Sequence, residues 1–236
     1  MSSRRLLLTR PIDQSREFAA VIDRRFPGRF DIRCAPLLRI EPSDVPIELD
    51  GIGALAFTSA NGVMQFVRRA RERSLPAYCV GKITAEAARN AGFRAYSADG
   101  NVSALGHMIA ARHDPQRGDV LHVRGTNAAG NLAGDLAAHG IACRAAEIYT
   151  QVPCPLETEI LAALVSGEAH VVALFSPRTA EQFDREVAHA SIPVEGLCAV
   201  CLSPPVASAL VLQPPGKIVV SGTPSREGMI EALARL

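Results

Sequence analysis

The sequence contains no tryptophan and only 3 tyrosines among its 236 residues. Proteins that bind single-stranded nucleic acid stack bases on aromatic rings, so this scarcity argues against that class. An excess of one charge is also missing: 25 basic and 24 acidic residues leave a formal net charge of +1. Because the charges form no long basic run, we expect no nucleic-acid partner.

Long apolar stretches are lacking too. No run approaches the roughly 18 residues of a membrane-spanning helix, and the apolar residues 6–8 meet Arg10 and Pro11 too early for a secretory signal. The sequence therefore predicts a cytoplasmic protein with no membrane partner. The cysteines are few and scattered, as expected for reduced thiols and not for a disulfide framework; they are Cys34, Cys79, Cys143, Cys154, Cys198 and Cys201.

Familiar cofactor and metal motifs are absent. The histidines show no HExxH or other ligand spacing, so we expect no metal. Residues 125–130 have the glycine spacing of a P-loop, but Asn131 and Leu132 replace the residues that contact phosphates and magnesium. This segment is predicted to be a glycine-permitted turn from strand to helix, although its amides could bind an anion. A nucleotide-dependent enzyme is disfavoured, and we expect no cofactor.

One cysteine pair has the spacing of a redox motif. Cys198 and Cys201 are separated by two residues, as in thioredoxin-like proteins, but both lie within an apolar run. Residues three apart in a strand point to opposite faces of the sheet. We therefore predict a buried structural pair.

Short apolar runs alternate with helix-periodic segments along the whole chain. This is the pattern of parallel sheets covered by helices on both faces, and the runs are residues 6–9, 53–57, 77–80, 120–123, 170–175, 197–202 and 217–220. Two further segments, 33–42 and 145–153, are extended by propensity and end in proline. We predict that these two segments pair as a two-stranded connector.

An internal repeat supports this partition. Ser59 and Ser176 each stand seven residues before a phenylalanine that follows a glutamine. The predicted fold is α/β, with two similar parallel-sheet domains joined by a two-stranded β linker. The domains are predicted at residues 1–36 plus 152–236 and at 42–146, and the linker strands at 37–41 and 147–151. Ligands of such sheets bind beyond the carboxyl ends of the strands.

Hydroxyl residues stand where these strands lead into helices. Taken singly, Ser59, Thr84, Ser176 and Ser203 are each expected to cap a helix. Taken together, several helix N-termini with hydroxyls and free amides facing one cleft would suit a ligand with many carboxylates. A cleft completed within one chain also favours a monomer.

The order and spacing of several short motifs resemble the uroporphyrinogen-III synthase family along nearly the whole chain. The motifs are Thr9-Arg-Pro11, Phe57-Thr-Ser-Ala-Asn-Gly-Val63, Val80-Gly-Lys-Ile-Thr-Ala85, Val123-Arg-Gly125, Tyr149-Thr150, Phe175-Ser-Pro-Arg-Thr-Ala180 and Leu202-Ser-Pro204. The resemblance implies a fold of two α/β domains with a two-stranded linker. It also implies a cofactor-free lyase that closes the linear tetrapyrrole hydroxymethylbilane into uroporphyrinogen III, with loss of water and inversion of the last pyrrole ring.

The resemblance also implies the site residues. Tyr149 corresponds to the family's proton donor, although it could equally be an interfacial aromatic of the linker. Residues expected to bind the substrate's carboxylate arms are Arg10, Ser59, Asn61, Thr84, Arg124, Gly125, Ser176, Thr179 and Ser203.

Two positions depart from the family pattern. Val206 stands where a threonine is frequent, and Ala129 stands where an arginine is common. Both remove a potential carboxylate contact. They leave open a second interpretation, in which the chain is a catalytically weak or inactive binding or regulatory homologue with the same two-domain fold.

Overall fold

The computed structural model describes residues 3–127 and 130–236, which belong to two compact units. Unit 1 comprises the chain up to Arg39 together with Val152–Leu236, and unit 2 comprises Ile40–Gln151. The chain therefore passes from one unit to the other twice, within the strands β3 (Leu38–Pro42) and β8 (Cys143–Pro153).

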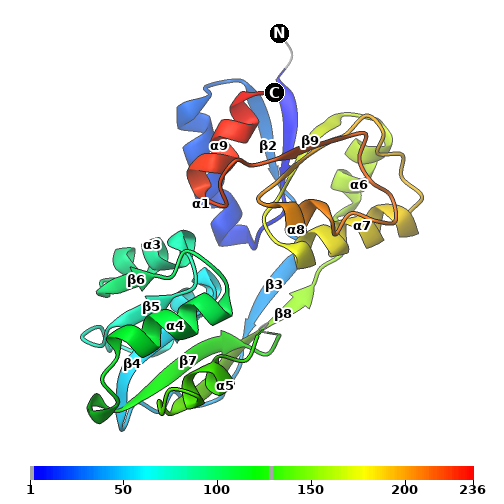
Figure 1. Ribbon diagram of the computed structural model, residues 1–236. Coiled ribbons are helices and arrows are strands. Elements are labelled where there is room, and N and C mark those ends of the chain that lie inside the picture. Colours follow the sequence, from blue (N-terminus) through cyan, green and yellow to red (C-terminus); the bar gives the residue numbers. More distant parts are fainter. Residues whose placement is uncertain (1–2, 128–129) are drawn as a thin grey trace. The chain divides into compact units, whose positions relative to one another are not determined.

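Unit 1 is built on a parallel sheet with the strand order β11-β10-β9-β1-β2. In Figure 1 its N-terminal part is blue and its C-terminal part runs from yellow-green to red. Side chains alternate along β1, so Leu7 joins the core beneath α6 and α7, whereas Leu6 and Leu8 join the core beneath α1 and α9. Its elements are β1 (Arg4–Leu8), α1 (Ile12–Arg25), β2 (Phe30–Cys34), α6 (Thr158–Val165), β9 (Ala169–Leu174), α7 (Pro177–His189), β10 (Cys198–Cys201), α8 (Pro204–Ala207), β11 (Lys217–Val220) and α9 (Arg226–Ala234).

Unit 2 is built on a sheet with the strand order β3-β8-β7-β4-β5-β6. The strands from β8 to β6 are parallel. Phe57 and Phe66 lie in the core on the side of α2 and α3, and Ala56 and Leu105 in the core on the side of α4 and α5. The remaining elements are β4 (Ile52–Phe57), α2 (Ala60–Arg69), β5 (Ala77–Cys79), α3 (Lys82–Asn90), β6 (Ala95–Ser97), α4 (Val102–Arg112), the 3-10 turn η1 (Pro115–Arg117), β7 (Asp119–Gly125) and α5 (Leu132–Ala137).

The two sheets have the same strand order once unit 1 is read in a permuted sequence. Starting at β9, unit 1 runs outward through β10 and β11, and then continues from α9 to β1 and β2 on the other side of β9. Unit 2 follows the same course from β4 through β5 and β6 to β7 and β8. A hydrogen bond from the Arg4 guanidinium to the Leu236 carbonyl holds α9 close to β1. The repeated serine turn is explained by this correspondence, because Ser59 follows β4 and Ser176 follows β9.

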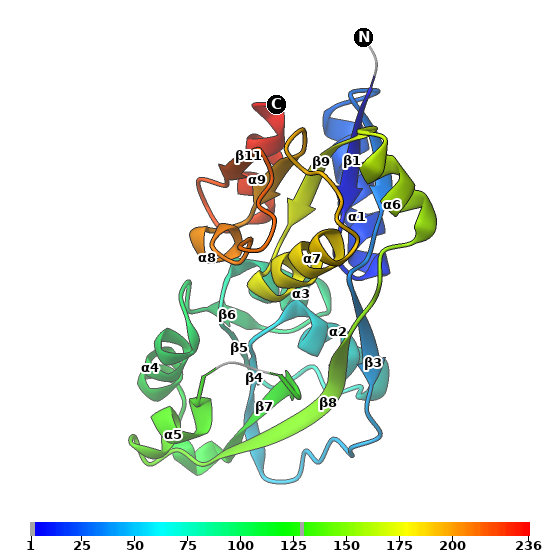
Figure 2. The ribbon, with the colours of Figure 1, turned by 90° about the vertical axis from the view of Figure 1, so that its right-hand side faces the viewer.

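The predicted connector differs from the structure at its first strand. Residues 33–42 do not form one extended segment: Cys34 ends β2, which pairs with β1, and Leu38 begins β3. Pro36 stands in the break, and proline cannot donate a hydrogen bond to a neighbouring strand. β3 and β8 run beside each other in opposite directions (Figure 2). Their antiparallel pairing is shown by two hydrogen bonds of 2.9 Å, from the Ser43 amide to the Ile148 carbonyl and from the Cys154 amide to the Leu37 carbonyl.

The cysteines of β10 behave as predicted. Both side chains are buried, and they face opposite sides of the sheet: Cys198 lies in the core beneath α1 and α9, and Cys201 in the core beneath α6 and α7. Burial raises the pKa of the Cys201 thiol to about 12. A protonated thiol without a facing partner is inert, so this pair is structural.

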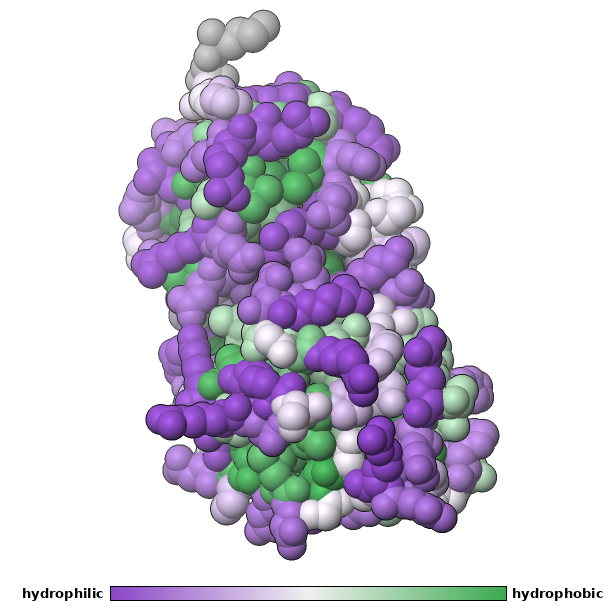
Figure 3. All heavy atoms as spheres, turned by 90° about the vertical axis from the view of Figure 1, so that its left-hand side faces the viewer, coloured by the Kyte–Doolittle hydropathy of each residue, from purple (hydrophilic) through white to green (hydrophobic). Residues whose placement is uncertain are grey.

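Hydrophilic side chains cover most of the face seen in Figure 3, and hydrophobic ones gather in separate small areas between them. Within residues 3–127 and 130–236, no helix is both long and apolar enough to span a membrane.

Candidate functional site

The strand order of unit 2 reverses between β4 and β7. From β4 the chain adds strands on one side of the sheet, and from β7 it adds them on the other. The helices that follow these two strands, α2 and α5, cover opposite faces. The carboxyl ends of the two strands therefore border a crevice, which is where open α/β sheets bind their ligands.

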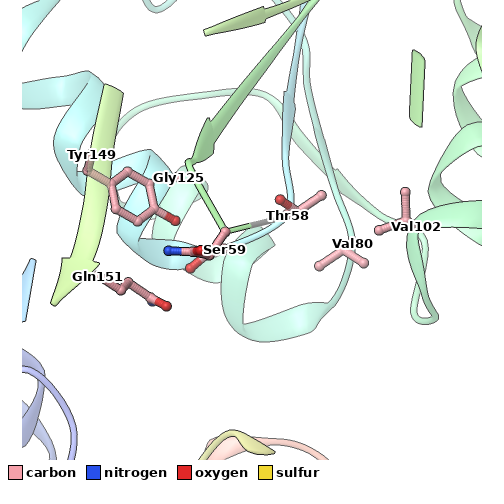
Figure 4. A pocket seen from close by; sticks show the side chains of 8 residues that line it. Thr58, Ser59, Val80, Val102, Gly125, Tyr149 and Gln151 are labelled. Atoms are coloured by element: carbon pink, nitrogen blue, oxygen red, sulfur yellow. The ribbon is translucent and has the colours of Figure 1, made fainter. Parts of the chain in front are cut away.

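A pocket of about 200 Å³ lies at this point (Figure 4). Thr58 and Ser59 directly follow β4, Gly125 ends β7, and Tyr149 and Gln151 lie on β8. The lining is completed by Val80, Val102 and Asn127. The polar groups of the pocket are thus hydroxyls, amides and one phenol.

Ser59 connects the pocket to the start of α2. Its backbone is extended, with φ −154°, and its Oγ accepts a hydrogen bond of 3.1 Å from the amide of Asn61. The serine is therefore the N-cap of α2, as its position in the sequence predicts. The helix N-terminus carries a partial positive charge, which favours a negatively charged group nearby.

Tyr149 lies against the end of β7, and its hydroxyl points toward Ser59 (Figure 4). Only 4% of the residue is exposed. A Cβ on Gly125 would stand 2.7 Å from Cε2 of the Tyr149 ring, so only glycine at this position allows the ring its place. Burial raises the pKa of Tyr149, while hydrogen bonds with the Ser59 side chain and the Gly125 backbone oppose that rise. The phenol is protonated at neutral pH, and two partners are in place to stabilise a phenolate.

Behind the pocket lies a buried histidine that the sequence did not single out. His122 Nε2 is 3.2 Å from Thr58 Oγ1, and only 3% of the histidine is exposed. Burial, together with the positive charge of Arg124, lowers the pKa of His122 to about 4. The imidazole is therefore neutral and fixes the orientation of the Thr58 hydroxyl. A signal was present in the sequence: His122 and Arg124 are polar residues that alternate with the apolar residues of β7.

Arg124 faces away from this pocket. Neighbouring residues of a strand point to opposite sides, and Gly125, not Arg124, lines the pocket. The Arg124 guanidinium pairs with Glu147, and its Nε is buried without a hydrogen-bond partner among the described residues.

Asn61 and Thr84 are also outside the pocket lining, and both side chains are buried. Thr84 is the third residue of α3 and not its cap, because Gly81 occupies the N-cap position. The glycine leaves the first amides of α3 without a side-chain acceptor, so these amides are open to other partners.

The other predicted residues belong to unit 1, after β1, β9 and β10. The Arg10 guanidinium lies 4.7 Å from the Phe175 ring centroid, and burial lowers its pKa to about 10, so it stays charged at neutral pH. Ser176 caps α7: its Oγ accepts from the Thr179 amide at 3.2 Å and lies 2.8 Å from the Thr179 hydroxyl. Ser203 occupies the N-cap position of α8 but makes no capping hydrogen bond.

The two departures from the family pattern have different outcomes. Val206 is 1% exposed and packs in the core of unit 1, so its side chain is part of the hydrophobic core. Ala129 lies outside the described residues. Within those residues, no cluster of three or more histidine, cysteine or acidic side chains could hold a metal ion.

Known proteins resemble this chain in sequence and in fold. The family model described as uroporphyrinogen-III synthase HemD matches residues 28–231. A crystal structure of uroporphyrinogen-III synthetase from Helicobacter pylori aligns over 99% of this chain and 100% of its own, with 18% identity and a TM-score of 0.64. A mutant uroporphyrinogen III synthase from Thermus thermophilus aligns over 99% and 98%, with 18% identity and a TM-score of 0.57. At this identity the structures establish the fold. No curated protein matches the sequence.

Proposed function

The chain belongs to the uroporphyrinogen-III synthase family, which serves tetrapyrrole biosynthesis, and we propose that it catalyses the reaction of that family. In this reaction, hydroxymethylbilane loses water and closes into uroporphyrinogen III with its last pyrrole ring inverted. The observation that carries the proposal is the placement of a buried, protonated phenol at the switch point of unit 2, beside the N-terminus of α2.

The chemistry of the pocket suits a substrate that carries many carboxylates. Ser59 and the first amides of α2 offer hydrogen-bond donors, and the helix N-terminus favours negative charge. The open N-terminus of α3 offers further donors. These groups would hold the acetate and propionate arms, and Arg10, Ser176, Thr179 and Ser203 of unit 1 are proposed to hold others.

Orientation of the substrate accounts for most of the catalysis in this proposal. The bilane closes without inversion when left to itself, so the protein must hold the electrophilic carbon against the substituted position of the last ring. Neither a metal nor a strong base is required for that selection. The shape of the pocket and the spacing of its donors decide which carbon reacts.

Tyr149 is proposed to protonate the hydroxyl group that leaves as water. The proton moves from the phenol to the departing oxygen, and the resulting phenolate is stabilised by the Ser59 hydroxyl and the Gly125 backbone. These two partners make the phenol a better acid in the transition state than its buried ring alone would be. The phenolate regains its proton when the cyclised product loses one.

The first test is the isomer of the product. The protein is supplied with freshly prepared hydroxymethylbilane, and the porphyrinogen isomers are separated after oxidation. We expect mainly type III. Type I alone, as forms without protein, would contradict the proposed activity and leave the binding or regulatory interpretation standing.

The second test addresses Tyr149. We expect Tyr149→Phe to lower turnover by roughly a hundred-fold, the lower limit for loss of a general acid, with little change in KM. Tyr96→Phe is the matched control, because Tyr96 lies on β6, outside the pocket lining. If Tyr149→Phe and Tyr96→Phe turn over equally fast, Tyr149 has no part in the proton transfer, whatever isomer the wild type makes.

A further inference from the structure

A second cavity, of about 190 Å³, opens at the amino ends of the unit 2 strands. Its walls come from residues that precede or begin β4, β5, β6 and β7, so it lies at the opposite edge of the sheet from the pocket with Tyr149. Among the lining residues are Tyr78, Arg94, Tyr96, Arg112 and Arg117. This group of cationic and phenolic side chains belongs neither to the switch point nor to the turns proposed to bind carboxylates.

The cationic groups of the cavity are not neutralised. Within the part of the chain that the structure describes, Arg94, Arg112 and Arg117 form no ion pair with a carboxylate. The one acidic residue of the lining, Asp114, accepts a hydrogen bond of 3.0 Å from the Gln116 amide as the cap of η1. Three arginines and one aspartate leave the lining with two positive charges in excess.

Two tyrosine rings line the cavity together with these arginines. The rings of Tyr78 and Tyr96 stack with centroids 5.6 Å apart and an interplanar angle of 25°. The guanidinium groups of Arg94 and Arg112 lie 5.9 Å and 5.1 Å from the Tyr96 centroid. These contacts hold the two long arginine side chains in defined positions, so less side-chain conformational entropy is lost when a ligand binds.

Tyr78 supplies a hydrogen-bond donor without a partner. The residue is 3% exposed and lines the cavity, and its hydroxyl makes no hydrogen bond with any described residue. Burial and the neighbouring Tyr96 raise the pKa of Tyr78, whereas Arg112, Arg94 and Arg117 act in the opposite direction. The three arginines thus line the same cavity as this hydroxyl.

We propose that this cavity is a binding site for a small, multiply charged phosphate-type anion, held by Arg94, Arg112, Arg117 and the Tyr78 hydroxyl. Guanidinium forks match the oxygens of such anions, and a compact dianion or trianion relieves the mutual repulsion of three neighbouring cations. The stacked rings occupy each other's faces, so recognition is by charge and hydrogen bonding and not by stacking of a base.

The test is calorimetric titration of the full-length protein with pyrophosphate at constant ionic strength and neutral pH. We expect saturable binding, weakened about ten-fold or more by Arg112→Gln, the effect of losing one charge-assisted hydrogen bond. Tyr78→Phe removes a single hydroxyl from a buried ring and is expected to weaken binding about three- to ten-fold. The Tyr78→Phe variant therefore tests the proposal even if Arg112→Gln does not fold.

Two control titrations locate the site. Arg24→Gln removes an exposed charge from α1 and should bind pyrophosphate as the wild type does. Citrate, which carries its charge on carboxylates, should bind more weakly than pyrophosphate. The proposal fails if pyrophosphate binds no better than chloride, or if Tyr78→Phe binds pyrophosphate as tightly as the wild type does. Its failure would leave the isomer assay and the proposed synthase activity untouched.

Discussion

A single buried imidazole links the stability of unit 2 to pH. The ordinary pKa of histidine is 6.5, and burial together with the charge of Arg124 lowers that of His122 to about 4. The facing groups offer no carboxylate: Thr58 bonds Nε2, and the Cys143 thiol contacts the backbone of His122. An unfolded chain therefore takes up a proton at this residue more readily than the folded chain does, so acid favours unfolding.

The sign and size of this effect can be measured. The contribution of the neutral His122 to the free energy of unfolding is complete above pH 6.5 and is lost as the pH falls toward 4. Between pH 7 and pH 5 we expect His122 to lower the free energy of unfolding by about 2 kcal/mol. Urea denaturation of the wild type and His122→Gln at both pH values gives the difference. His189→Gln, which removes an exposed histidine of α7, should retain the wild-type pH dependence. Parallel slopes for the wild type and His122→Gln would contradict the assignment.

The sequence predicts some residues of the pocket, but for a physical reason it misses His122 behind the pocket and Tyr78 in the second cavity. Ser59 and Gly125 stand at strand-to-helix turns, whose positions follow from the alternation of apolar runs and helical stripes, and Tyr149 follows from the family motif. His122 and Tyr78 lie inside strands, where their importance depends on the neighbours that the sheet supplies. Their partners Thr58 and Tyr96 are distant in the sequence or belong to another strand. The spacing of residues within one segment of the sequence cannot predict such contacts.

At the scale of the element, a buried carboxylate fastens the loop after α8 to α7. Asp184 is 2% exposed and accepts hydrogen bonds from the amides of Val211, Leu212 and Gln213 over 2.8, 2.6 and 2.9 Å. The side chains of Val211 and Leu212 are largely exposed, so apolar burial contributes little to holding this loop. The carboxylate accepts the backbone hydrogen bonds that the carbonyls of a neighbouring strand accept elsewhere.

Asp184→Asn should therefore destabilise unit 1. The amide keeps one acceptor oxygen but turns an NH₂ group toward a backbone donor, and it removes the charge from three hydrogen bonds. We expect the free energy of unfolding to fall by about 2 kcal/mol. The urea midpoint measures the change. Asp23→Asn, an exposed position of α1, is the control and should stay within about 0.5 kcal/mol of the wild type. Equal midpoints for the two variants would show that the loop is held by something else.

Element boundaries also show what the sequence can and cannot predict. The α/β class and the parallel sheets are confirmed, because strand length and helical periodicity are local properties. The division of residues 33–42 into β2 and β3 is not local: β2 is fixed by its pairing with β1, and β3 by its pairing with β8. Both parts have extended propensity, so only the partner strands separate them.

At the scale of the whole molecule, the permuted strand order of unit 1 makes a prediction about chain connectivity. A protein that begins at Pro155, runs to Leu236, continues through a short glycine-rich linker to residue 3 and ends at Cys154 keeps every strand intact. Arg4 already bonds Leu236, so the linker spans a short gap. Residues 154–157 form no helix or strand, and Pro155 is exposed, so new ends are tolerated there.

We expect this permuted protein to be produced in soluble form, with the circular dichroism spectrum of the wild type. The control is a permutation opened between Val172 and Ala173, two fully buried residues of β9, which should give little or no soluble protein. Equal soluble yields from the two permutations would contradict the idea that intact strands, and not the original order of the chain, determine folding.

The same correspondence bears on descent. A gene for one five-stranded unit, copied in tandem and later opened at a new place, would leave a chain whose first copy is split around its second, as unit 1 is split around unit 2. Ser59 and Ser176 would then be sister residues from a single ancestral turn, which today cap helices in both copies. An ancestor of half this length would have needed two molecules to assemble what one polypeptide now carries.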